Sequence, residues 1–329
     1  MASTNLQLVA RNPRQSDGVV LLSMLLVIIF LTALVYQIMM RHSLTIAQTE
    51  QTLNFDRLLS FALGAESLAR QALHQDHVTP GRKVDSLQDI WARPLEPLFI
   101  EDGVLEIQIR DLNRCFNLNS LSGPNPDKNA VRLGNLFSIL GVPSTLVDSW
   151  RDWVDNDQEL FGRGAEDGHY LLQSTSYRPP NTLAGHVSEL HLVKHMRPEY
   201  FELIEPYVCV IPSQELAINI NTVSGEILKS LEPKENQALI EQIVSEERYY
   251  ETVGDLTREL PGLASSADVL SVKSSYFEVH SRVGIEDNQI ELVSILYRDP
   301  QSGKIKLISR DLGKSFNSYY QKKVRGTDD

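Results

Sequence analysis

One uninterrupted apolar stretch near the N-terminus constrains this chain more than any other feature. It follows a short polar leader that carries Arg11 and Arg14, begins directly after Gly18, and runs from Val19 to about Met40. Roughly 22 residues in a helix span about 33 Å, which matches the ~30 Å hydrocarbon core of a bilayer. A cleaved secretory signal has a shorter apolar run, of about 7–15 residues. The stretch therefore predicts a membrane-spanning helix, and the two arginines predict that the leader stays in the cytoplasm.

The predicted helix extends well beyond the membrane. Between Val19 and about Gln75 there is no proline, and Gly64 is the only glycine. Beyond Arg41 the apolar residues lie near helical spacing, which predicts an amphipathic second half. These residues are Leu44, Leu53, Phe55, Leu58, Leu59, Ala62, Ala65, Leu68, Ala69 and Leu73. We expect one helix of about 55 residues, roughly 80 Å long, whose second half packs on a soluble domain.

The glycine between leader and apolar run resembles the type IV pilin and pseudopilin class. In that class a prepilin peptidase removes the leader after the glycine, and the new first residue is N-methylated. The resemblance implies cleavage after Gly18 and methylation of Val19. Most members carry a glutamate at mature position five, where this chain has Ser23. That departure resembles one branch of the class, the K-type minor pseudopilins of the type II secretion system (general secretion pathway protein K family).

The residue at position 23 bears on where the subunit can sit in a filament. A carboxylate in the hydrocarbon core costs a few kcal/mol unless it is paired, and in pilins the partner is a neighbour's N-terminal ammonium. A subunit with Ser23 cannot make that pair. The resemblance therefore implies a place at the filament tip rather than along the shaft.

Length, charge and cysteine content agree with a large extracytoplasmic domain. The chain has 329 residues and a net charge of −12, which allows one domain with a large insertion and disfavours nucleic acid as a partner. Cys115 and Cys209 are the whole cysteine complement. In an oxidising periplasm they could form a disulfide. Two buried thiols are the alternative.

Strand patterns occur at both ends of the soluble part and helical patterns lie between them. Residues 104–110 alternate, and three further strand candidates at 276–283, 289–298 and 304–310 predict an antiparallel meander. We expect an α+β fold in which a pilin-like long N-terminal helix packs on an antiparallel sheet, with a large helical domain inserted. The expected parts are a removed leader (1–18), the long helix (19–75, membrane-spanning to about 40), a loop and first strand (76–111), the inserted helical domain (112–272), the meander (273–313) and a tail (314–329).

The predicted insertion contains an internal repeat. Residues 116–123 (FNLNSLSG) align with 218–225 (ININTVSG) without a gap, and a helical pattern follows each copy. Each copy resembles a helix-hairpin-helix element, which in many proteins binds DNA phosphates through backbone N–H groups. Pro143 has no N–H to donate, and residues 148–167 carry seven acidic residues and two arginines. We therefore expect the repeat to act in packing, with no nucleic-acid partner.

The same acidic segment contains candidate metal ligands. Oxygen ligands on a flexible loop suit calcium, and the spacing partly matches an EF-hand loop. Leu160 occupies the sixth position, where an EF-hand needs glycine, so the geometry must differ. An acidic run alone is more often a solvated surface. However, residues 150–157 (WRDWVDND) resemble a calcium-binding stretch of the K family, so the resemblance implies a structural calcium site. The candidate ligands are Asp155, Asp157, Glu159, Glu166 and Asp167.

The sequence matches known catalytic motifs poorly. His191 and His195 are four residues apart, but Leu192 stands where a zinc-protease motif requires glutamate. Asp148 and Asp152 are one helical turn apart, and we expect such helix carboxylates to be solvated. The sequence has neither a phosphate-binding glycine-rich loop nor a nucleophile elbow. We expect no enzymatic activity.

The resemblance implies a minor pseudopilin that caps or initiates the periplasmic pseudopilus tip, for export of folded proteins across the outer membrane. It implies the inner membrane as the location, with a cytoplasmic N-terminus and the bulk of the chain in the periplasm. The expected partners are other minor pseudopilins at the tip, the major pseudopilin, the prepilin peptidase and inner-membrane lipid. Two alternatives remain: an unprocessed single-pass periplasmic adaptor and a DNA-uptake minor pilin.

Overall fold

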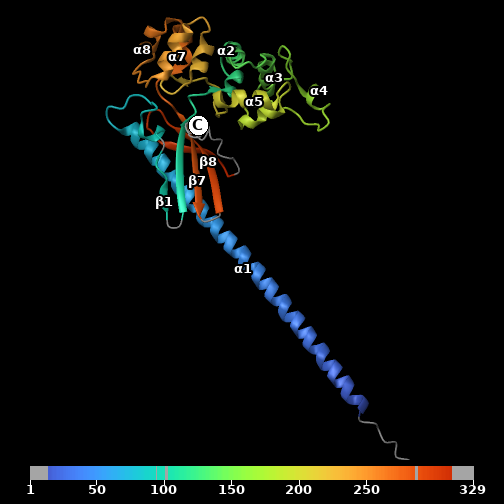
Figure 1. The fold of residues 1–329 in the computed structure, drawn as a ribbon. Helices are drawn as coiled ribbons and strands as arrows, with labels where there is room; N and C mark the ends of the chain where they lie inside the picture. Colours follow the sequence, from blue (N-terminus) through green and yellow to red (C-terminus); the bar gives the residue numbers. More distant parts are fainter. Residues whose placement is uncertain (1–13, 94, 101–102, 286–287, 313–329) are drawn as a thin grey trace, which may run out of the picture. The chain divides into compact units, whose positions relative to one another are not determined.

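The computed structural model describes residues 14–93, 95–100, 103–285 and 288–312, and side chains from Val19 onward (Figure 1). The predicted tail, 314–329, and residues 1–13 of the predicted leader lie outside the described residues. The chain divides into two units, Met1–Arg57 and Leu58–Asp329.

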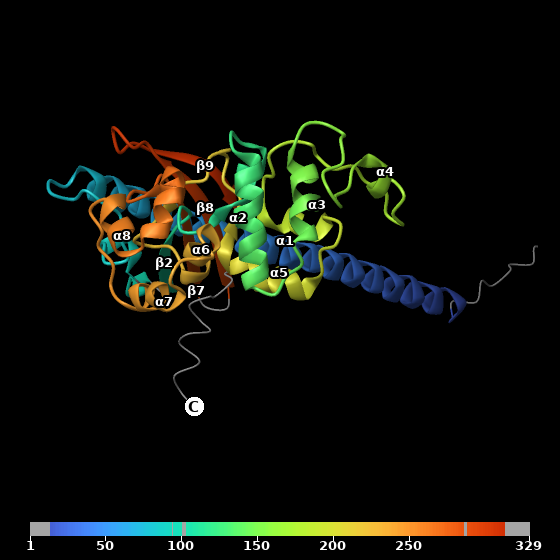
Figure 2. The ribbon, with the colours of Figure 1, turned by 90° about the horizontal axis from the view of Figure 1, so that it is seen from above.

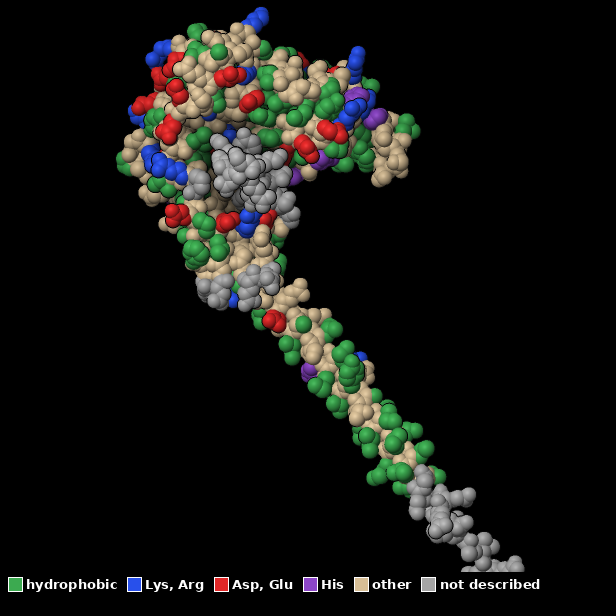
Figure 3. Space-filling view, in the orientation of Figure 1, with side chains coloured by type: hydrophobic (Ala, Val, Ile, Leu, Met, Phe, Trp, Pro, Cys, Tyr) green, Lys and Arg blue, Asp and Glu red, His purple; other side chains and the backbone are tan. Residues whose placement is uncertain are grey.

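Helix α1 (Arg14–Val78) dominates the first unit. It begins before Val19 and ends after Gln75, so it is longer at both ends than the sequence predicted. Its apolar side chains between Val19 and Met40 are exposed, and hydrophobic side chains gather along the visible face of this part of the helix (Figure 3). Among the described residues, α1 is the one helix long and apolar enough to cross a membrane.

In the second unit, residues 58–78 of α1 pack against a five-stranded antiparallel sheet in the order β1-β2-β7-β8-β9. Alternate residues of β2, such as Leu105, Ile107 and Ile109, face a buried apolar cluster that includes Leu58 and Leu73 of the helix. The period of two places these residues on one face of the sheet. The strands are β1 (Leu98–Ile100), β2 (Gly103–Asp111), β7 (Tyr276–Ile285), β8 (Asn288–Arg298) and β9 (Ile305–Asp311). The predicted antiparallel sheet is confirmed, but residues 98–100, expected to be loop, form a short edge strand.

A buried carboxylate also fastens α1 to the sheet. Glu66 is 2% exposed and accepts hydrogen bonds from Arg310 Nε at 2.6 Å and Ser294 Oγ at 2.8 Å. Arg310 and Ser294 lie on β9 and β8, so this contact supplements the apolar packing.

The chain leaves the sheet after β2 and returns at β7, with a mainly helical insertion between them. Helices α7 and α8 lie on one side of the insertion and α3 and α4 on the other, with α2 between (Figures 1 and 2). The α-helices are α2 (Pro126–Ile139), α3 (Thr145–Val154), α4 (Asp167–Tyr170), α5 (Pro198–Ile204), α6 (Gly225–Leu231), α7 (Gln237–Ser245) and α8 (Val253–Glu259). The 3-10 helices are η1 (Ile90–Ala92), η2 (Leu118–Ser122), η3 (Val187–Leu192), η4 (Glu205–Tyr207) and η5 (Pro261–Val269). Two short parallel pairs join β3 (Phe116–Asn117) to β4 (Val208–Cys209) and β5 (Ile218–Asn219) to β6 (Leu270–Ser271).

The internal repeat has a packing role in each copy. Asn119 exchanges two hydrogen bonds with the backbone of Ala184, and Asn221 does the same with Tyr250. In each copy the amide thus satisfies the N–H and the C=O of a distant loop residue, which would otherwise be buried without partners.

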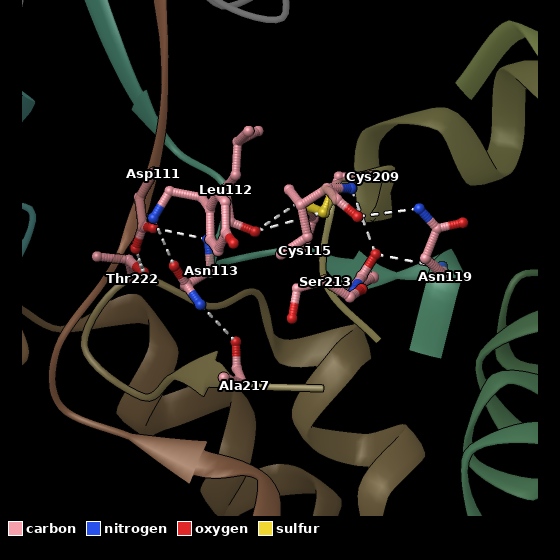
Figure 4. Close-up of a disulfide and its surroundings, with 12 residues drawn as sticks. Asp111, Leu112, Asn113, Cys115, Asn119, Cys209, Ser213, Ala217 and Thr222 are labelled. Carbon is pink, nitrogen blue, oxygen red and sulfur yellow. Dashed lines mark hydrogen bonds between the residues drawn. A yellow bond between two sulfur atoms is a disulfide. The ribbon is translucent and has the colours of Figure 1, made fainter. Parts of the chain in front are cut away.

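Buried polar contacts attach the insertion to the sheet (Figure 4). Asp111, at the end of β2, accepts hydrogen bonds from Thr222 Oγ1 at 2.6 Å, Ser274 Oγ at 2.7 Å and Asn113 N at 2.7 Å. Burial raises the pKa of Asp111, and these donors oppose that effect. Nearby, Cys115 and Cys209 form a disulfide, with their Cα atoms 5.7 Å apart.

Candidate functional site

The acidic segment begins on helix α3, which two buried tryptophans hold in place. Trp150 is fully buried and donates a hydrogen bond from Nε1 to the Leu118 carbonyl at 3.0 Å. Trp153 is 2% exposed and donates to Glu189 Oε2 at 2.9 Å. The helix ends at Val154, so the position of Asp155, the next residue, is fixed by a firmly packed helix.

The segment after α3 folds back onto that helix through backbone N–H groups. Phe161 N donates to Asp152 Oδ1 at 2.9 Å, and Arg163 N donates to Asp148 Oδ2 at 3.0 Å. Asp152 is fully buried. The expectation of two solvated helix carboxylates is therefore wrong for Asp152, because the folded-back segment covers it.

Two glycines make this close approach possible. A Cβ on Gly162 would lie 2.4 Å from Asp148 Oδ2, and one on Gly164 would lie 2.0 Å from Asp152 Oδ2. Gly162 also has a φ of +55°, a conformation that suits glycine.

Folding the segment back brings three of the predicted ligands together. One carboxylate oxygen from each of Asp155, Asp157 and Glu166 lies within 4.8 Å of the others. Glu166 is 6% exposed. Both of its carboxylate oxygens and Asp155 Oδ1 are buried with no hydrogen-bond partner in the part of the chain that the structure describes. Because buried polar atoms are normally paired, these oxygens are candidates to bind a cation.

The raised pKa values of the clustered carboxyl groups also favour a bound cation. Burial, and then the charges of Asp152 and Asp155, raise the pKa of Glu166 to about 7. Burial, and then the charges of Asp157 and Asp152, raise the pKa of Asp155 to about 6. A divalent cation would favour the ionised carboxylates and offset their repulsion. An all-oxygen donor set fits calcium, which takes six to eight oxygens at about 2.3–2.6 Å.

The other two predicted ligands lie outside this cluster. Glu159 is exposed, and its backbone N–H donates to Asp157 Oδ1 at 2.8 Å. Asp167 begins α4 and faces Arg178, with Oδ2 3.4 Å from Nη1. The EF-hand spacing suggests Glu159, at the fifth position of such a loop, but the turn at Gly162 and Gly164 directs the chain differently.

A cleft of about 410 Å³ adjoins the cluster. Its lining includes Asp155, Asp157, Asn181, Arg151 and Gln214. Asn181 comes from a segment that the sequence did not mark as part of the site.

A second acidic group, Asp76, Asp85 and Asp89, is paired with two arginines. Arg82 Nη1 lies 2.6 Å from both Asp76 Oδ1 and Asp89 Oδ1, and Arg298 Nη2 lies 2.5 Å from Asp85 Oδ2. This group is an ion-pair network, so we do not assign a metal to it.

The remaining residues singled out by the sequence lie apart from this site. His191 stacks on Phe201 with ring centroids 3.9 Å apart, and neither His191 nor His195 belongs to a metal-compatible cluster among the described residues. Helix α1 passes through Gly18 and Val19 without a break. Ser23 Oγ donates to the Val20 carbonyl at 2.8 Å.

The sequence of this chain is similar to proteins of one secretion system. Residues 114–213, which include α3 and the acidic cluster, match the family described as Type II secretion system (T2SS), protein K. Type II secretion system protein K of Pseudomonas aeruginosa is 32% identical over 317 residues, which cover 91% of this chain and 94% of that protein. The chain belongs to the type II secretion system protein K family.

Further similarities extend over both sequence and fold. Type II secretion system protein K of Klebsiella pneumoniae is 32% identical over 237 residues, covering 68% of this chain and 72% of that protein. A chain in the crystal structure of the GspK-GspI-GspJ complex from enterotoxigenic Escherichia coli matches with a TM-score of 0.73 at 25% identity. That match covers 82% of this chain and 100% of the other. It confirms the predicted α+β fold of this protein K family member.

Membership in the family classifies the chain as a component of a secretion system, as the sequence predicted. The apolar N-terminal helix suggests a single-pass membrane anchor.

Proposed function

We propose that this protein K family member is the minor pseudopilin that caps or initiates the tip of the periplasmic pseudopilus. The observation that carries the proposal is Ser23 in the exposed, apolar part of α1. Its hydroxyl is satisfied within its own helix, so it needs no partner from a subunit above. A shaft subunit would instead need a carboxylate there to pair with a neighbour's N-terminus.

The solved relative supports the choice of partners. Its chain was crystallised in a GspK-GspI-GspJ complex. We infer that this chain assembles with two other minor pseudopilins of the same kind, with the major pseudopilin following below them. Since helices associate in the bilayer through packing rather than the hydrophobic effect, the exposed face of α1 is the expected contact surface.

We infer that the chain is inserted in the inner membrane with its N-terminus in the cytoplasm and residues beyond about 40 in the periplasm. The prepilin peptidase would then cleave after Gly18 and leave an N-methylated Val19. Mass spectrometry of the mature N-terminus tests this step. A chain that keeps its leader would contradict it and favour the unprocessed adaptor.

Secretion by a strain that lacks the gene tests the tip assignment. We expect such a strain to stop exporting folded proteins, and we expect the wild-type gene or Ser23→Ala to restore export. Ser23→Glu should restore it poorly, because an unpaired carboxylate within the membrane is costly. Full export with Ser23→Glu, or without the gene, would contradict the proposal.

We also propose a structural calcium ion at Asp155, Asp157 and Glu166. Its support is the set of buried, unpaired carboxylate oxygens in one cluster. The ion would hold the segment after α3 in its folded-back conformation. It would have no catalytic part.

A further inference from the structure

Asn181 belongs to the irregular segment between α4 and η3, far along the chain from the acidic cluster. Its Nδ2 nevertheless donates a hydrogen bond to the Asp157 backbone carbonyl at 2.5 Å. Its side chain also lies close enough to Glu166 to lower the pKa of that carboxylate, against the larger effect of burial. The segment between α4 and η3 thus meets the cluster through one amide group.

The backbone of Asn181 is left-handed, and its side-chain oxygen lacks a partner. Its φ is +46°, in a region that asparagine adopts more often than most residues other than glycine. Its Oδ1 is buried and accepts no hydrogen bond from any described residue. Because Nδ2 is held on Asp157, the direction of Oδ1 is fixed as well.

The unpaired oxygen of Asn181 extends the set already described. Asp155 Oδ1 and both carboxylate oxygens of Glu166 are likewise buried and unpaired. Asn181 lines the same cleft as Asp155 and Asp157. Amide carbonyl oxygens are ordinary calcium ligands, and three carboxylates alone leave coordination positions open.

We propose that Asn181 Oδ1 is a ligand of the cation, and that cation binding thereby attaches residues 171–186 to the end of α3. The inference rests on the proposed calcium site. It gives the ion a second role, because a ligand at Asn181 would add to the contacts that this segment already makes with the acidic segment, the Trp153–Tyr177 ring contact and the Arg178–Asp167 pair.

Three variants separate the ligand from the backbone. Asn181→Gly keeps the left-handed backbone but removes the oxygen, and Asn181→Asp keeps an oxygen at that position. Asn156→Gly is the matched control, since Asn156 is exposed and lines the same cleft. Calcium affinity is measured by isothermal titration calorimetry on the full chain in detergent. Hydrogen exchange of peptides covering residues 171–186 is measured with calcium and with chelator.

We expect Asn181→Gly to weaken calcium binding by about tenfold or more, and Asn181→Asp and Asn156→Gly to bind like the wild type. Calcium should slow exchange in residues 171–186 of the wild type but not of Asn181→Gly. Equal affinity and equal protection in wild type and Asn181→Gly would overturn the role of Asn181 alone. A wild-type chain that binds no calcium would overturn the calcium site itself.

Discussion

Glu166 is held where an isolated carboxylate would be unstable. It is buried, it lies beside two other carboxylates, and it receives no hydrogen bond from the described residues. Replacing it with glutamine removes a repelled charge while keeping the size of the side chain. The effect of such a change should therefore depend on whether calcium is present.

We expect Glu166→Gln to melt at a higher temperature than the wild type in chelator, by about 2–4 °C for each kcal/mol of relieved repulsion. In calcium at a hundred times its Kd the wild type should gain about 2.7 kcal/mol, and the variant should gain much less. Differential scanning calorimetry of the full chain measures both. Glu159→Gln, outside the cluster, is the control and should respond to calcium like the wild type. A calcium response of Glu166→Gln equal to that of the wild type would remove this residue from the site.

The candidate site is predictable at some residues and hidden at others. The alternating carboxylates Asp155 and Asp157 mark an oxygen-rich loop in the sequence itself. The burial of Asp152 is not visible there, since it depends on two glycines folding the chain back onto α3. The approach of Asn181 is equally hidden, because it depends on a tertiary contact with Asp157.

At the scale of secondary structure, the folded-back segment depends on close packing at Gly164. A Cβ there would meet Asp152 Oδ2 at 2.0 Å and the Asp148 backbone oxygen at 2.9 Å. Gly164→Ala should destabilise the chain by about 1–3 kcal/mol and abolish its calcium response. Gly168→Ala is the control, because nothing lies within 4 Å of its Cβ. Urea unfolding with and without calcium distinguishes them, and equal behaviour of the two variants would contradict this account.

The attachment of α1 to the sheet should depend on pH through Glu66. Burial raises the pKa of this carboxyl, but hydrogen bonds from Arg310 and Ser294 and the nearby arginine charges outweigh it and lower the pKa below 4.5. A lowered folded-state pKa stabilises the fold above the unfolded value, and this contribution is lost as the pH falls through the folded value.

The difference in unfolding free energy between wild type and Glu66→Gln should therefore be largest near neutral pH and shrink below about pH 4.5. Chemical denaturation at several pH values measures it. Glu96→Gln provides a comparison at an exposed carboxyl. A difference that does not change with pH would show that the ionised form of Glu66 contributes nothing.

The predictability of the elements follows from their length. Long strands such as β2 and β7 repeat the alternation of buried and exposed residues often enough to be recognised. β1 has three residues, and β3 pairs two residues with a strand more than ninety residues away. Such short pairs leave no periodic pattern, because tertiary contacts alone bring them together.

Across the whole chain, the exposed part of α1 and the folded domain that follows it differ in the surfaces that they present. Residues 19–57 of α1 expose a long helical surface and have few charges in their apolar half. Residues 58–312 form a sheet with an insertion joined by the buried contacts of Asp111. An exposed apolar helix and a large domain with its own core are compatible with the proposed place at the end of a filament.

The proposed place at the tip is tested by locating this chain along assembled filaments. The experiment overproduces the major pseudopilin to lengthen the filaments and locates this chain on them by electron microscopy with gold-labelled antibody against residues 112–272. We expect gold at one end of each filament. Gold spread along the shaft, or filaments without any gold, would contradict the proposed place at the tip.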